Sequence, residues 1–238
     1  MTITVWTNEI KNLYVWSSAI KEAYVWDVKV RPSWWKPWAN TIAYYPFDWN
    51  ISDYSWNWRN LSWTWSFVSW WPWQVFNVTN VYSDASAFDI YGTQAFTLCL
   101  WLKVTSMPSS YDSIMWMQQW SNPDTHDKEI DIWSWWVVKF QMWNGSEYLI
   151  QSNTNISSNQ WYNIVATFDG SSRKLYINWV NVWSWSGWSS YNHNPPRLVF
   201  RRRWDGSYNI SNAVVENAWW SVSDVWNFYT LTKSNYWL

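Results

Sequence analysis

Tryptophan occupies positions where a chain must turn, and this feature constrains the fold more than any other. Of the 238 residues, 31 are Trp and only 5 are Gly, whereas average usage would give roughly 17 Gly in a chain of this length. Many Trp lie in polar stretches rich in Ser, Asn and Asp, such as DWN (48–50), SWNWRN (55–60) and NWVNVWSWSGWSS (178–190). Such stretches are typical of turns, which require positive φ angles that glycine adopts freely and aromatic residues adopt poorly.

We therefore interpret most of the Trp as glycine encoded by UGA, a codon that some bacterial lineages read as glycine and a standard translation prints as Trp. The three stretches then become DGN, SGNGRN and NGVNVGSGSGGSS, and Asn-Gly and Asp-Gly are the strongest hairpin signals. The alternative is a protein truly rich in Trp, either an aromatic lectin or a membrane-interface binder. Trp101 and Trp161 fit buried strands as they stand, while Trp143 and one of Trp219 and Trp220 are ambiguous.

Charge and cysteine content exclude several classes of protein. A net charge of −1 gives no basic excess for nucleic-acid binding, and a hydrophobic content of 48% argues against disorder. We expect no membrane insertion by a helix, because no long apolar run exists. The single Cys excludes an intrachain disulfide framework and a Cys-based zinc site. The first residues, MTITVWTNEI, lack the pattern of a signal peptide.

The chain divides into four predicted segments. IKNLYVW (10–16) recurs as IKEAYVW (20–26), which predicts a β-rich extension over residues 1–32, either a small β-meander or an arm that pairs with another copy or an appendage partner. Residues 33–40 read as a Pro/Gly-type linker. A domain follows over 41–218, in which short strand-like runs alternate with turn signals at a spacing typical of an antiparallel sandwich. The predicted strands lie near 41–47, 73–78, 95–104, 113–117, 129–133, 137–143, 147–151, 160–168, 174–178, 180–183, 197–201 and 208–216.

Residues 219–238 are predicted to form a C-terminal helix and tail. Ser221 and Asp224 have the spacing of a capping box, in which each side chain bonds to the other residue's backbone N–H. Val222, Val225 and Tyr229 follow at i, i+3 and i+7, the spacing of one helix face.

Four segments together resemble the laminin-G-like jelly-roll family: IAYYPFDWNISDYSWNWRNLS (42–62), AFTLCLWLKV (95–104), QWYNIVATFDGSSRKLYINWVNV (160–182) and LVFRRRWDG (198–206). The resemblance covers about residues 41–217 in order and spacing. It implies an all-β fold, a concanavalin A-like antiparallel β-sandwich (jelly roll), here with a short β-rich N-terminal extension and a short C-terminal helix. The N-terminal repeat resembles segments of phage tail and surface-appendage proteins, which favours an extracellular, cell-surface or virion-associated location.

The resemblance also implies a structural calcium ion in the first loop of the domain. Asp48, Asp53 and Asn57 surround that loop, and calcium takes six to eight oxygen ligands. The alternative is that these side chains cap turns through their own backbone. Family members often carry a late acidic residue, where this chain has Asn212, a departure that weakens the calcium prediction.

Glu129 and Asp131 stand in EIDIW (129–133), and laminarinase-type glucanases of the same fold carry E-x-D-x-E on one strand. Strand alternation places all three positions on one face. The third position here is Trp133, which cannot donate a proton as either Trp or Gly, so we expect no enzyme activity. The alternative for the two acids is a solvated sheet edge.

Other reactive residues have ordinary interpretations. Cys99 lies in an apolar strand and reads as a buried structural residue. His126 and His193 lie in predicted loops and are weak metal ligands. The basic run Arg201–Arg203 could bind an anionic glycan, although alternation favours a solvated strand end. Four tyrosines near predicted loops are candidates to contact a sugar: Tyr111, Tyr148, Tyr191 and Tyr208.

Three functions fit these residues. The first is a non-catalytic module that binds a glycan or surface polysaccharide and supports adhesion, using loops on a rigid sandwich. The second is an assembly module of a phage tail or surface appendage, attached through residues 1–32. The third is a glucanase of the same fold, since fold alone does not determine function.

Overall fold

The structure is a computed structural model, and it forms two compact units, residues 1–35 and 36–238. It describes residues 23–25, 28–30, 40–47, 52–55, 57, 59–62, 66–70, 73–77, 81–83, 88, 90, 94–118, 126–143, 147–186, 197–200 and 206–236. In the first unit, β1 (Ala23–Val25) and β2 (Val28–Val30) pair as an antiparallel hairpin. Within residues 1–32, which were predicted to be rich in β-structure, these two strands are the described part.

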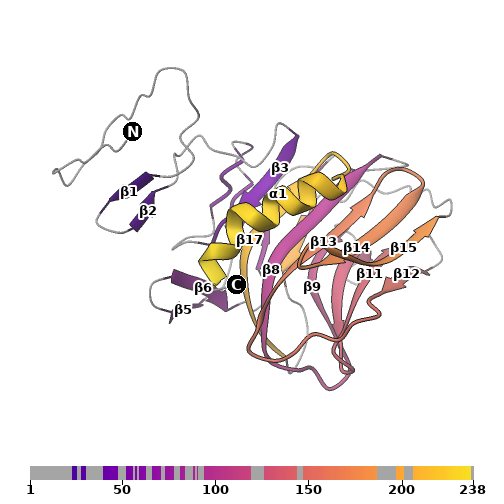
Figure 1. Ribbon diagram of the computed structural model, residues 1–238, viewed down its shortest axis with the longest axis horizontal. Coiled ribbons are helices and arrows are strands. Elements are labelled where there is room, and N and C mark those ends of the chain that lie inside the picture. The colour runs from indigo at the N-terminus through magenta and orange to yellow at the C-terminus, as the bar shows by residue number, and fades with distance from the viewer. Residues whose placement is uncertain are drawn as a thin grey trace. The chain divides into compact units, whose positions relative to one another are not determined.

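The described strands of the second unit form two antiparallel sheets (Figure 1). The seven-stranded sheet has the order β12 (Glu147–Gln151), β11 (Val137–Trp143), β10 (His126–Trp133), β9 (Tyr111–Gln118), β16 (Arg197–Phe200), β7 (Val81–Ser83) and β4 (Leu61–Ser62). The eight-stranded sheet has the order β15 (Val180–Ser186), β14 (Ser172–Ile177), β13 (Trp161–Phe168), β8 (Phe96–Ser106), β17 (Ser207–Glu216), β6 (Trp73–Asn77) and β5 (Ser66–Trp70), with β3 (Thr41–Tyr45) also paired to β17.

The hydrophobic core lies between the two sheets. Alternate residues of each strand enter it because side chains of a strand point to opposite faces. On β8 these are Phe96, Leu98, Leu100, Leu102 and Val104, all fully buried. The facing sheet contributes a matching row from β10 and β11, made of Ile130, Ile132, Val138, Phe140 and Met142.

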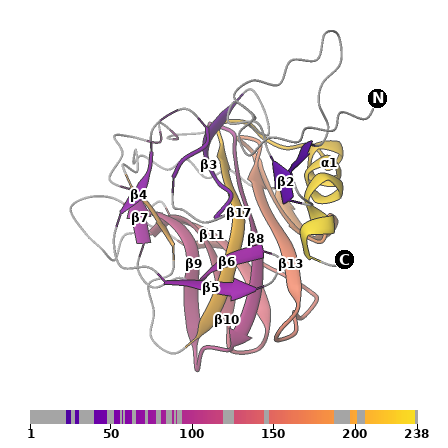
Figure 2. The same cartoon turned by 90° about the vertical axis from the view of Figure 1, so that its left-hand side faces the viewer.

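Helix α1 (Val222–Thr232) packs on the outer face of the eight-stranded sheet, on the side of β8 and β13 (Figure 2). Its predicted capping box is confirmed, since Ser221 and Asp224 exchange side-chain to backbone hydrogen bonds. The predicted apolar face is right at Val225 and wrong at Val222, which lies in the first turn and is 54% exposed. Phe228 and Thr232 complete the buried face instead.

Two aromatic residues of β8 and β13 anchor the C-terminal segment. The rings of Trp101 and Tyr236 stack with centroids 4.1 Å apart, and Trp161 lies 4.8 Å from the same tyrosine ring. The Trp101 Nε1–H donates to Thr232 Oγ1 at 2.8 Å. The prediction that Trp101 and Trp161 are buried strand residues is therefore confirmed.

The predicted fold class, a concanavalin A-like antiparallel sandwich with a C-terminal helix, is confirmed. Every predicted strand has a counterpart within a few residues. The prediction missed β4, β5 and β7, because Ser and Trp in residues 61–70 read as a loop and β7 has only three residues. Among the described residues, we find no helix with the length and apolar character of a membrane-spanning segment.

Candidate functional site

A polar cluster lies on the outer face of β9, β10 and β11, on the side of the sheet away from the core. Ile130 and Ile132 of β10 enter the core, so the alternating residues Glu129, Asp131 and Trp133 point the other way. Strand pairing brings the neighbours of these three residues into register. Asp131 pairs with Lys139 on β11 and with Ser113 on β9, and Trp133 pairs with Tyr111. We call Tyr111, Ser113, Glu129, Asp131, Trp133 and Lys139 the acid-pair face.

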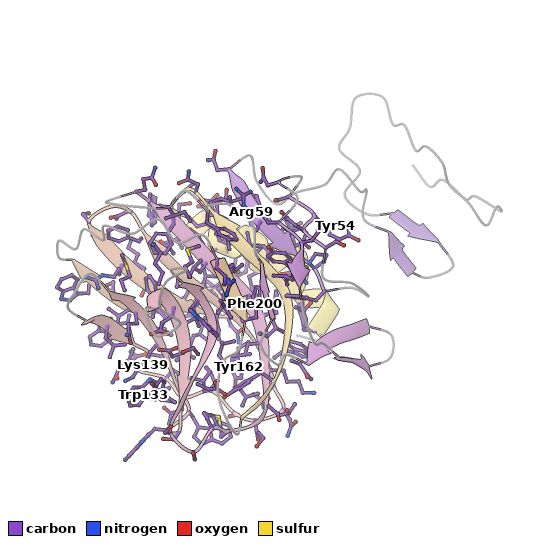
Figure 3. All side chains as sticks on the ribbon, turned by 180° about the vertical axis from the view of Figure 1, so that it is seen from behind. Tyr54, Arg59, Trp133, Lys139, Tyr162 and Phe200 are labelled. Carbon is purple, nitrogen blue, oxygen red and sulfur yellow. The ribbon has the colours of Figure 1, made fainter. Side chains whose placement is uncertain are left out.

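Short contacts hold these side chains together. The Ser113 hydroxyl donates to Glu129 Oε2 at 3.1 Å. The Tyr111 and Trp133 rings stack with centroids 5.5 Å apart. The Lys139 ammonium lies 3.1 Å from the centre of the Trp133 ring, and Figure 3 shows the two side chains together on the face opposite α1. The result is a row of polar groups beside a flat aromatic surface.

The two acids are buried beneath this layer. Glu129 is 3% exposed and Asp131 is 1% exposed. Burial raises the pKa of Asp131 well above its ordinary value, and the charge of Glu129 raises it further, whereas the Ser113 hydrogen bond and Lys139 oppose the shift. Within the described part of the chain, Oδ1 of Asp131 has no hydrogen-bond partner. Buried polar atoms are usually hydrogen-bonded, so this oxygen is an exception within the cluster.

The prediction that Glu129 and Asp131 share one strand face is confirmed. The alternative of a solvated sheet edge is wrong, since β10 lies between β9 and β11 in the interior of the sheet. At the third position of the pattern, Trp133 brings an indole, which can donate a hydrogen bond but no proton to a leaving group. The acid-pair face therefore contains two carboxyl groups on β10 and a ring in place of a third.

Sequence reasoning missed Ser113 and Lys139. Ser113 lies on β9, 16 residues before Glu129, and Lys139 lies on β11, eight residues after Asp131. Only the strand register brings these two residues next to the acids. A β-bulge in β9 also shifts that register between the partners of Ile130 and Asp131. No local motif carries this information.

Asp53 organises the loop that was predicted to hold calcium. Its two carboxylate oxygens accept four hydrogen bonds of 2.8–3.0 Å, from the backbone N–H groups of Tyr44, Ser55 and Arg59 and from the Ser55 hydroxyl. This pattern is the turn-capping role given above as the alternative.

Asn57 stabilises the same loop from the other side. Its amide nitrogen donates to the carbonyl oxygens of Thr41 and Ile42. In the described part of the chain, no three side chains of His, Cys, Asp or Glu come together as a metal site. Asp48, the third predicted ligand, lies outside the described residues, so the calcium site stays a prediction.

The remaining candidates separate clearly. Cys99 is buried, as predicted, and burial raises the pKa of its thiol. The prediction for Tyr208 is wrong, because its ring is fully buried in the core and cannot face a ligand. Asn212 is buried within a bulge of β17 and bonds to Tyr44 and Tyr236. The prediction that His126 lies in a loop is wrong, because it is the first residue of β10, although its side chain is not described. The side chain of Tyr148 is not described either, and Tyr191, His193 and Arg201–Arg203 lie outside the described residues.

Solved structures similar to this chain are mostly binding domains. The binding domain of Paraclostridial Mosquitocidal Protein 1 has a TM-score of 0.66 and 17% identity, covering 80% of this chain and 52% of that one. A botulinum neurotoxin type C structure, whose cell entry depends on two ganglioside molecules, has a TM-score of 0.66 and 13% identity, with 80% and 51% covered. This chain thus spans about half the length of those toxin domains.

A third similar structure matches over nearly its whole length. Domain 4 of AbnA, a GH43 extracellular arabinanase from Geobacillus stearothermophilus in complex with arabinotriose, has a TM-score of 0.64 and 14% identity, with 80% of this chain and 98% of that chain covered. None of the curated proteins matches this chain in sequence. The family model of the concanavalin A-like lectin/glucanases superfamily matches residues 77–223, more than half of the chain. The chain belongs to the concanavalin A-like lectin/glucanases superfamily.

Proposed function

We propose that this chain is a non-catalytic carbohydrate-binding module and that the acid-pair face is its sugar site. The observation that carries the proposal is the row of Ser113, Asp131 and Lys139, held in strand register beside the stacked rings of Tyr111 and Trp133. The two rings are only partly buried, whereas the acids lie beneath them, so a sugar would pack on the rings and bond to the polar groups at their edge.

The chemistry of the cluster suits a polyhydroxyl ligand. A sugar hydroxyl both donates and accepts hydrogen bonds. Asp131 keeps its proton to higher pH than an ordinary aspartate, and a protonated carboxyl both donates and accepts. The Lys139 ammonium adds donors, and the Tyr111 ring, stacked on Trp133, offers an apolar surface with a polar tip. A few placed polar groups beside an aromatic wall are typical of small-ligand sites.

The similar structures support this class of function. One is a domain of an arabinanase that holds arabinotriose, and another belongs to a neurotoxin whose cell entry depends on gangliosides. Sharing a fold does not transfer a ligand, and the argument for binding here rests on the acid-pair face. We extend the proposal to an adhesion role at an extracellular, cell-surface or virion-associated location, with a surface polysaccharide as partner.

Catalysis is not part of the proposal. Glycosidases place one carboxyl group to protonate the leaving oxygen and a second to attack or to activate water. In the E-x-D-x-E arrangement of glucanases the proton donor would occupy position 133, where this chain has an indole. The remaining Glu129 and Asp131 form a hydrogen-bonded pair with Ser113 rather than facing each other across a cleft.

The test is a glycan array with purified protein and three variants. We expect Tyr111→Ala, Lys139→Met and Asp131→Asn each to weaken binding of the selected glycan about tenfold or more, as the loss of one good hydrogen bond or ring contact would. The matched control is Asp169→Asn, in the turn between β13 and β14 of the other sheet, which should bind normally. Binding unchanged in all three variants would contradict the site. Sugar release from β-glucan that Glu129→Gln abolishes would favour the glucanase instead.

A further inference from the structure

Two tryptophans adopt a left-handed backbone conformation. The φ angle is 65° at Trp136 and 66° at Trp179. A side chain with a β-carbon rarely adopts such angles, whereas glycine does so freely. Both residues lie in hairpin turns. The residue found at each turn position can therefore be compared with the residue that this type of turn prefers.

The turn between β14 and β15 is a two-residue loop. Ile177 pairs with Val180, which leaves Asn178 and Trp179 as the central residues. Both have positive φ, 49° and 66°, which defines a type I′ turn. Asn-Gly is the preferred sequence for this turn, with glycine at the second position, where this chain has Trp.

The turn between β10 and β11 has three residues. Trp133 pairs with Val137, so the loop is Ser134, Trp135 and Trp136. The Trp136 N–H donates to the carbonyl oxygen of Trp133 at 2.9 Å, which closes a β-turn, and Trp136 is the left-handed residue that follows. Three-residue hairpins place glycine at this position. Two different turn types thus have Trp where each requires Gly.

The other residues with positive φ have a reason to be there. Gly170, with φ 98°, follows Asp169 in the turn between β13 and β14. Asn159 and Asn212 belong to the residue type that best tolerates this region after glycine. Phe47 has φ 59°, and its fully buried ring packs 5.5 Å from Phe200 in the core.

Trp179 and Trp136 are less buried than Phe47, although the Trp179 ring lies 4.8 Å from the Trp226 ring and Trp136 packs against the edge of the core. Trp179 is 41% exposed, and Trp136 is only partly buried. Other tryptophans of the chain behave as core residues. Trp101 and Trp161 are 0% and 6% exposed and pack around Tyr236. Positions 136 and 179 thus combine a positive φ angle with incomplete burial, whereas Trp101 and Trp161 are buried and are not among the residues with positive φ.

We infer that residues 136 and 179 are glycine in the native polypeptide, inserted at UGA codons, and that Trp101 and Trp161 are tryptophan. Glycine at position 136 removes the strain at the end of β10 that adjoins the acid-pair face. The partly buried ring at position 136 and the 41% exposed ring at position 179 are then absent from the native protein, whereas Tyr111 of the acid-pair face is not a Trp position and is unaffected.

Peptide sequencing by mass spectrometry of the protein from its source organism tests the inference. Trypsin releases residues 129–139, which contain position 136, and residues 175–197, which contain position 179. Fragment ions should give glycine at both positions. The internal control is residues 140–173, where position 161 should give tryptophan. Any residue other than glycine at position 136 or 179 overturns the inference, and so does glycine at 161.

A second measurement uses recombinant protein with the printed sequence. Trp136→Gly and Trp179→Gly should each raise the midpoint of thermal unfolding, because they remove a strained side chain from a turn. Trp161→Gly should lower the midpoint, because it empties a buried position. A lower midpoint in both turn variants would contradict the inference. Neither measurement depends on sugar binding, so failure of the proposed function would leave this inference intact.

Discussion

Asp131 and Lys139 lie directly opposite each other on β10 and β11, yet the pKa of Asp131 is raised well above its ordinary value. Burial is the largest cause and the charge of Glu129 adds to it, and together they outweigh the lysine. The fold therefore holds an acid in a place where its ionised form is unfavourable. Carboxyl groups with raised pKa values are frequent at functional sites.

We predict that Asp131→Asn raises the free energy of unfolding at pH 7. The folded state keeps the Asp131 proton at pH values where the unfolded state has lost it. Stability therefore falls as pH rises from the ordinary value of 3.8 through the folded-state pKa. Asparagine cannot ionise, so the gain should shrink toward zero as the pH is lowered to about 4. Urea unfolding at several pH values measures both effects.

Asp169→Asn is the matched control with the opposite sign. Partial burial would raise the pKa of Asp169, but hydrogen bonds from Ser172 and Ser171 lower it overall. Its contribution to stability is present above the ordinary pKa and is lost as the pH falls. The variant should therefore lose stability at pH 7 and match the wild type in acid. If both variants showed the same pH dependence, our account of the acid-pair face would be wrong.

Asp53→Ala should destabilise the domain by about 2 kcal/mol, because it leaves backbone N–H groups of Tyr44, Ser55 and Arg59 without their acceptor. Chemical denaturation checks this value. Asn57→Asp provides a comparison, since it removes the amide donor to Thr41 and Ile42 and keeps the size of the side chain. No loss of stability in Asp53→Ala would show that the loop is held by something else.

The same variant tests the calcium prediction. If calcium binds this loop, added calcium raises the unfolding midpoint of the wild type, EDTA lowers it, and Asp53→Ala responds to neither. An unfolding midpoint that is the same with calcium and with EDTA would contradict the prediction that this loop binds calcium. The hydrogen bonds of Asp53 would then be the loop's organising element.

Trp101→Ala should cost about 3–5 kcal/mol, the range for removing a large buried aromatic side chain. The variant loses the stack on Tyr236 and the hydrogen bond to Thr232, so the C-terminal helix should detach before the sheets unfold. Leu231→Ala, on the exposed side of α1, should change stability by less than about 0.5 kcal/mol, because Leu231 is 55% exposed. Equal losses in the two variants would contradict the assigned packing of the helix.

Much of the fold follows from local signals in the sequence. An apolar run predicted β8, alternating apolar residues predicted β13, and the Ser221–Asp224 spacing predicted the start of α1, because each pattern acts within one element. Only part of the acid-pair face could be predicted from the sequence. Glu129 and Asp131 share a strand and could be identified, but their burial and their pairing with Lys139 depend on which strands become neighbours. The register between strands that are distant in sequence is not encoded in a local sequence pattern.

Residues 1–32 are predicted to mediate association with another copy or an appendage partner. The hairpin of β1 and β2 lies in a compact unit separate from the sandwich, so deletion of residues 1–32 should leave the fold of the larger unit intact. We expect the deletion to reduce the oligomeric mass measured by light scattering and to retain glycan binding. An unchanged mass would remove the assembly role, and lost glycan binding would show that the sugar site includes this segment.

The most direct test of the sugar site is an NMR titration of isotope-labelled protein with the glycan selected on the array. The account predicts chemical-shift changes at the backbone amides of Ser113, Glu129, Asp131 and Lys139 that saturate together, and that need about tenfold more glycan or more in Asp131→Asn. Changes confined to the opposite sheet and helix α1, with the amides of β9, β10 and β11 unmoved, would contradict it.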